Sequence, residues 1–197
     1  LLLFYALELT SVFVTGVLRR TTPLWLVWME MMFLGVVFSR SIYWGLAGTI
    51  LGGLLVGLGS GSEVAMGSQP LMGGVLAFSG SLSMGMYMLI GRRFRLLLPS
   101  LVYSWLVFLV AAGVMVTAVL ITATPITGYS WYAYLWILLV TFLTQFLGHI
   151  PINFALKHFH ATTISLFMQV SVAASGVVAF FFFNEVPTLL QFLGSVV

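Results

Sequence analysis

Long apolar runs with almost no charge between them limit what this chain can fold into. Of its 197 residues, 61% are hydrophobic and 6% are charged, whereas roughly a quarter of the residues are charged in soluble domains. In hydrocarbon, backbone groups can pair only within helices or closed barrels, and continuous apolar runs of about 20 residues indicate helices. The sequence therefore predicts an all-α polytopic membrane protein with about seven or eight helices.

Two residue types that carry much of protein chemistry are absent from the sequence. The chain has no Cys and no Asp, which excludes disulfides, thiolate metal sites and aspartyl proteolysis. We therefore expect no metal and no cofactor. The net charge of +3 is too small to indicate nucleic-acid binding. We expect the partners to be the lipid bilayer and a small-molecule substrate, and we leave a homo-oligomer open.

Apolar runs and turn residues mark the expected spans. We expect a partial span at 1–9, and the start of a last helix after 187. Full spans are expected at about 12–37, 42–58, 71–91, 98–122, 131–156 and 161–183. Glycines four residues apart, Gly48/Gly52 and Gly53/Gly57, predict close helix packing. Because the chain begins and ends inside apolar runs, we interpret it as a fragment.

The sequence contains an internal repeat: when the chain is aligned with a shifted copy of itself, Ala6 falls on Ala155. The same shift, without a gap, pairs Phe33 with Phe182, Gly45 with Gly194 and Arg20 with Gln169. An odd number of expected spans separates the two copies, so their orientations in the membrane are opposite. Inverted repeats are typical of secondary transporters, with the binding site near the midplane. We therefore expect an inverted-repeat bundle, with the end of the first repeat at 1–58, a loop at 59–70 and the second repeat at 71–197.

The repeat also predicts the orientation of the chain. It places a turn at 8–12, so Arg19 and Arg20 lie about two turns inside a helix. The remaining basic residues then share one membrane face, while the opposite loops carry Glu8, Glu63 and Glu185. The positive-inside rule places the basic face in the cytoplasm; its residues are Arg40, Arg92, Arg93, Arg95 and Lys157.

Several segments resemble the EamA type of the drug/metabolite transporter superfamily. They are FYALELTSV (4–12), TTPLW (21–25), FLGVVFSRSIYWGLAG (33–48), GRRFR (91–95), LGHIPINFALKHFHATTISL (147–166) and FFFNEVPTLLQFLG (181–194). The resemblance implies a ten-helix fold of two inverted five-helix repeats, of which this chain covers about the third to the tenth helix. It implies export of metabolites or drugs, and we expect a bacterial inner membrane. The Gly-Glu that the family commonly has at the end of the fourth helix is Gly35-Val36 here, and the usual Glu-Pro of the ninth is Ser171-Val172.

Charged side chains at membrane depth usually face a cavity or a partner. Arg19 and Arg20 can offer a bidentate fork to a carboxylate or phosphate group, and the alternative is that both reach the outer headgroups. Pro23 removes the backbone hydrogen bond to residue 19, which predicts a loosened helix beside them. Glu30 lies deeper in the same helix, where burial favours a neutral carboxyl group. It is either a proton carrier or a structural hydrogen-bonded residue.

A second set of polar side chains lies on the span at 131–156. Thr141, Gln145, His149 and Asn153 follow a four-residue spacing, which predicts one polar stripe along a helix. Such a stripe either lines a water path or joins helices by hydrogen bonds. Histidine exchanges protons near neutral pH, so His149 and Glu30 are the candidates for proton coupling.

The leading hypothesis is a secondary transporter that works by alternating access. We expect export of a small polar or amphipathic metabolite or drug, driven by a proton gradient or by exchange. The substrate-binding candidates are Arg19, Arg20, Trp25, Tyr87, Gln145, His149 and Gln169. The alternatives are a non-transporting membrane scaffold and an intramembrane enzyme. No motif clusters a nucleophile with a base, so we expect no enzyme and no catalytic residue.

Overall fold

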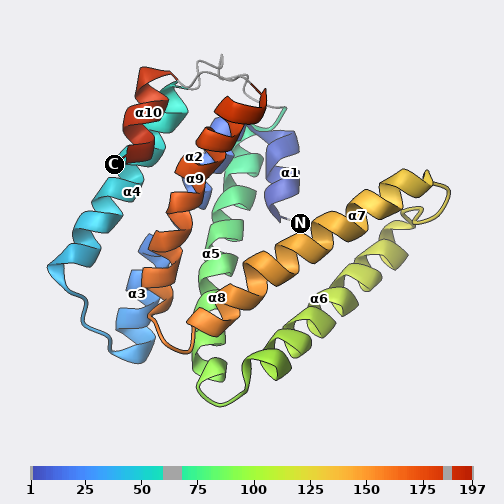
Figure 1. The fold of residues 1–197 in the computed structure, drawn as a ribbon, viewed down its shortest axis with the longest axis horizontal. Coiled ribbons are helices and arrows are strands. Elements are labelled where there is room, and N and C mark those ends of the chain that lie inside the picture. The colour runs from blue at the N-terminus through green and yellow to red at the C-terminus, as the bar shows by residue number, and fades with distance from the viewer. Residues whose placement is uncertain (1, 60–67, 184–187, 197) are drawn as a thin grey trace. The chain divides into compact units, whose positions relative to one another are not determined.

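The computed structural model describes residues 2–59, 68–183 and 188–196, and every regular element in these ranges is a helix (Figure 1). Four stretches among these residues are long and apolar enough to cross a membrane. They are α4 (Arg40–Gly59), α5 (Pro70–Arg95), α6 (Ser100–Thr122) and the continuous stretch Trp131–Ala155. The predicted all-α polytopic membrane fold is confirmed. Residues 60–67 of the predicted loop and the predicted turn at 184–187 lie outside the described residues.

The helices form two compact units, which we describe separately. The first unit comprises Leu1–Leu89 and His160–Val197, and the second comprises Ile90–Phe159. The first unit contains α1 (Leu2–Leu9), α2 (Val12–Arg19), α3 (Thr22–Leu34), α4, most of α5, α9 (Ala161–Phe183) and α10 (Leu189–Val196). The second contains the end of α5, α6, α7 (Trp131–Leu143), the π-helical segment η1 (Thr144–His149) and α8 (Ile150–Ala155).

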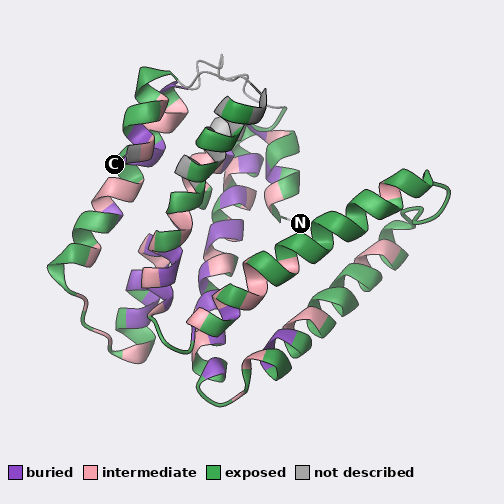
Figure 2. Cartoon of the chain, viewed as in Figure 1, coloured by how far each residue is buried: buried purple, intermediate pink, exposed green. Residues whose placement is uncertain are grey.

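In the first unit, α3 packs against α9 and α4 packs against α10. Buried side chains concentrate on α3 and α5, as Figure 2 shows, and include Leu26, Met29 and Met88. Glycines permit the close approach of α4 and α10: a Cβ atom on Gly194 would lie 2.6 Å from the carbonyl oxygen of Gly52. This glycine belongs to α10, and the prediction that Gly48/Gly52 and Gly53/Gly57 of α4 serve helix packing stays a prediction.

The helix boundaries of the first unit recur at the spacing of the sequence repeat. The shift pairs the first residue of α2, Val12, with the first residue of α9, Ala161. It also pairs the first residue of α4, Arg40, with the first residue of α10, Leu189. One difference between the described helices of the two copies is that α2 and α3 are separate helices while α9 is continuous. Val172 stands in α9 where Pro23 stands in the first copy, and proline both lacks an amide donor and clashes with the preceding turn.

In the second unit, a buried arginine ties the end of α5 to α8. The Arg95 side chain is 2% exposed; its Nε–H donates to the Asn153 carbonyl oxygen at 2.7 Å, and its Nη1 donates to the Leu98 carbonyl oxygen. The Asn153 amide in turn donates to Ser104 Oγ of α6 at 3.0 Å. Asn153 therefore joins helices, which is one of the two roles expected for the polar stripe.

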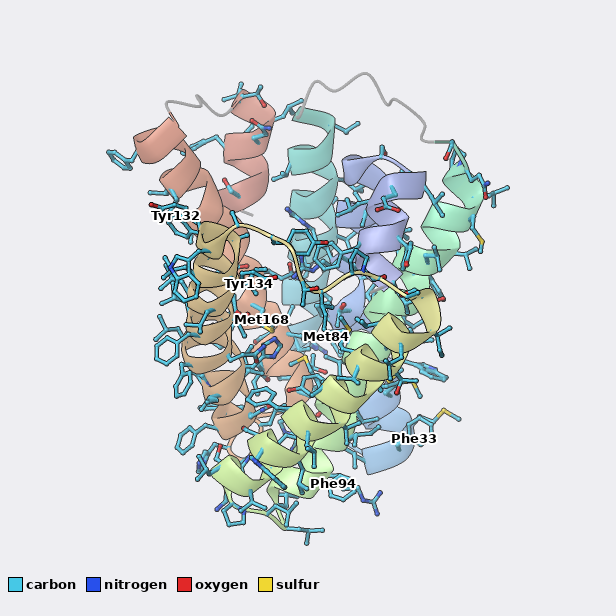
Figure 3. All side chains as sticks on the ribbon, turned by 90° about the vertical axis from the view of Figure 1, so that its right-hand side faces the viewer. Phe33, Met84, Phe94, Tyr132, Tyr134 and Met168 are labelled. Atoms are coloured by element: carbon cyan, nitrogen blue, oxygen red, sulfur yellow. The ribbon has the colours of Figure 1, made fainter. Side chains whose placement is uncertain are left out.

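The span at 131–156 contains a π-helical segment, η1, whose i→i+5 hydrogen bonds give a wider turn than that of an α-helix. The single polar stripe predicted along this span stays a prediction. Thr141 is exposed, Gln145 and His149 are half-buried, and Asn153 is fully buried. At the other end of this stretch, Tyr132 and Tyr134 lie at the head of α7 (Figure 3), and the Tyr134 hydroxyl donates to the Ile126 carbonyl oxygen at 3.0 Å.

Replacing Gly194 by Ala tests the α4–α10 contact. The added methyl group would meet backbone atoms of α4 at 2.6 and 2.8 Å, so we expect the variant to lose about 1–3 kcal/mol of stability. Gly113→Ala in α6 is the control, because a Cβ atom there meets nothing within 4 Å and alanine is the better helix former. Thermal unfolding in detergent measures both; equal melting temperatures would contradict the predicted contact.

Candidate functional site

The first functional feature is the helix break at Arg20 and Thr21. The Arg20 amide donates to the Gly16 and Val17 carbonyl oxygens, and α3 then starts with Pro23 in its first turn. Proline has no amide hydrogen to offer the Arg19 carbonyl oxygen, which instead accepts a hydrogen bond from the Thr22 hydroxyl at 2.8 Å. The loosened helix predicted from Pro23 is confirmed as a break between α2 and α3.

The Arg20 side chain extends from this break and lies beside Gly53 of α4. It is half-buried, and a Cβ atom on Gly53 would lie 3.0 Å from Arg20 Cδ. The absence of a side chain at Gly53 therefore gives room to the aliphatic part of the arginine. Within the described part of the chain, no hydrogen bond or ion pair engages the Arg20 guanidinium group. Arg19 is exposed at the end of α2.

The neutral polar groups beside Arg20 are bonded to one another. The Thr21 hydroxyl donates to the Leu18 carbonyl oxygen at 2.6 Å and accepts from Trp25 Nε1 at 3.1 Å. Its oxygen also lies 3.4 Å from Ser81 Oγ of α5. Trp25 packs edge-on against Phe78 of α5, with ring centroids 5.0 Å apart. These contacts fix α3 on α5, and none of the hydrogen bonds found there among the described residues uses the Arg20 guanidinium group.

The second feature is a buried carboxylate at the start of α9, which we call the Glu30 cap. Glu30 of α3 is fully buried; its Oε1 accepts from the Ala161 amide at 3.0 Å, and its Oε2 accepts from the Thr162 amide at 3.1 Å and the Thr162 hydroxyl at 2.7 Å. The first amides of a helix have no partner within it, and a carboxylate there also interacts favourably with the helix dipole. These hydrogen bonds fit the structural alternative described for Glu30, and its role as a proton carrier stays a prediction.

The residue that precedes α9 explains why another helix supplies its cap. Under the repeat, Ser11 before α2 is equivalent to His160 before α9. Ser11 Oγ accepts a hydrogen bond from the Val14 amide at 3.2 Å, as is usual for a serine at this position. Histidine is not a usual capping residue. His160 Nδ1 lies 3.8 Å from Glu30 Oε1, and its ring contacts Phe38 edge-on.

The remaining predicted binding residues are divided between the units. Tyr87 on α5 and Gln169 on α9 are half-buried in the first unit, which also holds Arg19, Arg20 and Trp25. Gln145 and His149 lie in η1 of the second unit, and Gln145 Oε1 is buried without a hydrogen-bond partner in the described ranges. The described residues contain no group of three or more His, Cys, Asp or Glu side chains placed to hold a metal ion.

One comparison with known proteins finds a match. The sequence model of the EamA-like transporter family matches residues 71–197, which is more than half of the chain. No curated protein and no solved structure matches the sequence.

Removal of the Glu30 carboxylate tests whether it stabilises the first unit. Glu30→Ala leaves the amides of Ala161 and Thr162 without their acceptor, and we expect a loss of about 1–3 kcal/mol. Glu8→Ala is the matched control, because Glu8 is exposed on α1. Thermal unfolding of both variants in the same detergent makes the comparison, and a Glu30→Ala protein as stable as Glu8→Ala would refute a stabilising role for the cap.

Proposed function

We propose that this chain is a secondary transporter with a substrate site at the α2–α3 break. The premise is that the chain belongs to the EamA-like transporter family, whose members are membrane transporters of the drug/metabolite superfamily. The transported compound is a small polar or amphipathic metabolite or drug with an anionic group. The observation that carries this proposal is the half-buried Arg20 guanidinium group without a protein partner among the described residues.

A charge at membrane depth costs about 3 kcal/mol or more, and it is retained mainly where it has a partner or a function. Arginine binds carboxylate and phosphate groups in a bidentate fashion. The polar neighbours Thr21, Trp25 and Ser81 are occupied with each other, so the guanidinium group is available to a ligand. The repeat pairs Arg20 with Gln169 of α9, which supports a substrate with one anionic end and one neutral polar end.

Broken helices at the interface of inverted repeats are a recurring element of transport sites. The break beside Arg20 and the recurrence of helix boundaries in α9 and α10 support such an architecture here. Trp25 and Tyr87 offer aromatic surfaces for the apolar part of the substrate. Arg19 keeps its predicted role as a binding residue beside Arg20. For Gln145 and His149 of the second unit, substrate binding stays a prediction from the sequence, as does proton coupling for His149.

The orientation that we propose follows from the basic residues. Arg40 at the start of α4, Arg92 and Arg93 in the last turn of α5, and Lys157 before α9 face the cytoplasm by the positive-inside rule. The proposed location is a bacterial inner membrane, with transport by alternating access towards the outside. A proton gradient or exchange supplies the driving force.

Uptake by the full-length protein in liposomes tests the proposed function. We expect accumulation of an anionic metabolite, and we expect Arg20→Gln to raise its KM about tenfold or more, because a charge-assisted hydrogen-bond pair is lost. Arg19→Gln removes the same charge from the exposed neighbouring side chain and should have the smaller effect. An imposed pH gradient, with His149→Ala as the variant, separates proton-coupled transport from exchange.

Two results of this assay would contradict the proposal. Equal KM values for the Arg20→Gln and unmodified proteins would remove Arg20 from the substrate site. Well-folded protein that transports none of a broad set of anionic and neutral metabolites would favour the membrane scaffold.

A further inference from the structure

We infer that the Glu30 cap is a closing contact of the transport cycle, made in the state seen here and broken when the transporter opens at this end. The inference rests on the proposed alternating-access function, and it gives Glu30 and Thr162 the role of positioning residues. The substrate does not touch them. Their hydrogen bonds set which of two conformations the protein occupies.

The first argument is the position of the cap between the two predicted repeats. Glu30 belongs to α3 of the first repeat, while its donors Ala161 and Thr162 belong to α9 of the second. Alternating access moves one repeat against the other, so this contact lies where motion is required. All three donor groups belong to two consecutive residues, and a small displacement of the α9 start therefore breaks the three hydrogen bonds together.

The second argument is that only one of two equivalent helices takes its cap from another helix. The equivalent helix α2 is capped by its own Ser11. In α9 the equivalent residue is His160, so the start of the helix depends on α3. The carboxylate also has no equivalent in the second copy, because the repeat pairs Glu30 with Ala179. The sequence thus provides one such contact, at one end of the first unit.

The third argument is that this end of the first unit lies at the surface of that unit. Glu30 lies one turn before the end of α3, and its donors are the first residues of α9. The His160 side chain beside it is 42% exposed although Glu30 itself is fully buried. In the proposed orientation this end is cytoplasmic, since Lys157 and Arg40 flank the same two helices. Breaking the Glu30 cap would therefore open the cytoplasmic side.

A single reactive thiol on α9 can report the opening. Ser165 is buried, 3% exposed, and lies one turn after the donors of the cap. The printed sequence has no Cys, so Ser165→Cys in a full-length protein without other cysteines places one probe there. The rate of its reaction with a water-soluble maleimide in proteoliposomes measures how often water reaches this face of α9.

Two substitutions weaken the cap without changing its shape. Thr162→Val removes the hydroxyl donor and keeps the amide, and we expect the labelling rate at position 165 to rise roughly two- to tenfold. Glu30→Gln replaces one acceptor oxygen by a donor, and we expect a rise of about tenfold or more. Thr15→Val is the matched control, because Thr15 is buried in α2 and its hydroxyl has no hydrogen-bond partner among the described residues.

An increase for Thr162→Val over Thr15→Val supports the inference, even if Glu30→Gln does not fold. An unchanged rate for Thr162→Val overturns it and leaves Glu30 as a static helix cap. The labelling assay needs no known substrate. Failure to find uptake would thus count against the proposed transport, while an unchanged labelling rate in a protein that does transport would count against the closing contact alone.

Discussion

A charged side chain that is removed from water needs partners within the protein. Three charged side chains, the buried Glu30 and Arg95 and the half-buried Arg20, meet this need in different ways. Glu30 is bonded to the start of α9, and Arg95 is bonded to the Asn153 and Leu98 carbonyl oxygens. Arg20, by contrast, has no partner in the described part of the chain. The two engaged charges each join helices within one unit, and the unengaged one is the best candidate to meet a ligand.

A single proline explains much of the difference between the two copies of the repeat. The first copy breaks at Arg20 and Thr21, and the second runs as one helix through the equivalent Gln169 and Val170. Pro23 cannot donate to the Arg19 carbonyl oxygen, and Thr22 replaces the missing bond with its hydroxyl. Val172 stands at the position equivalent to Pro23, so the two copies form an asymmetric pair in which the broken copy carries the cationic side chain of Arg20.

Hydropathy predicted most of the fold, because membrane spans are set by local composition. The expected span 161–183, for example, has the bounds of α9. The break between α2 and α3 was predicted from Pro23. The π-helical segment at Thr144–His149 was not predicted, since no residue there demands it locally. The cap was also missed, because its partners are 131 residues apart in sequence. One signal was available: His160 stands where the repeat has Ser11, which marks a helix start without its own cap. Arg20 and Trp25 were predicted and do lie at the break, whereas the placement of Gln145 and His149 in a separate unit depends on long-range packing.

The sequence distance within the Glu30 cap also bears on biosynthesis. Ribosomes add about 5–20 residues per second, so α3 is made on the order of ten seconds before its donors on α9, 131 residues later. During that interval the carboxyl group of Glu30 has none of the three hydrogen bonds that it accepts in the finished protein. An isolated α3 segment with this side chain is a poorer substrate for membrane insertion than its apolar neighbours suggest. The Glu30 cap consequently forms only after the start of α9 has been synthesised.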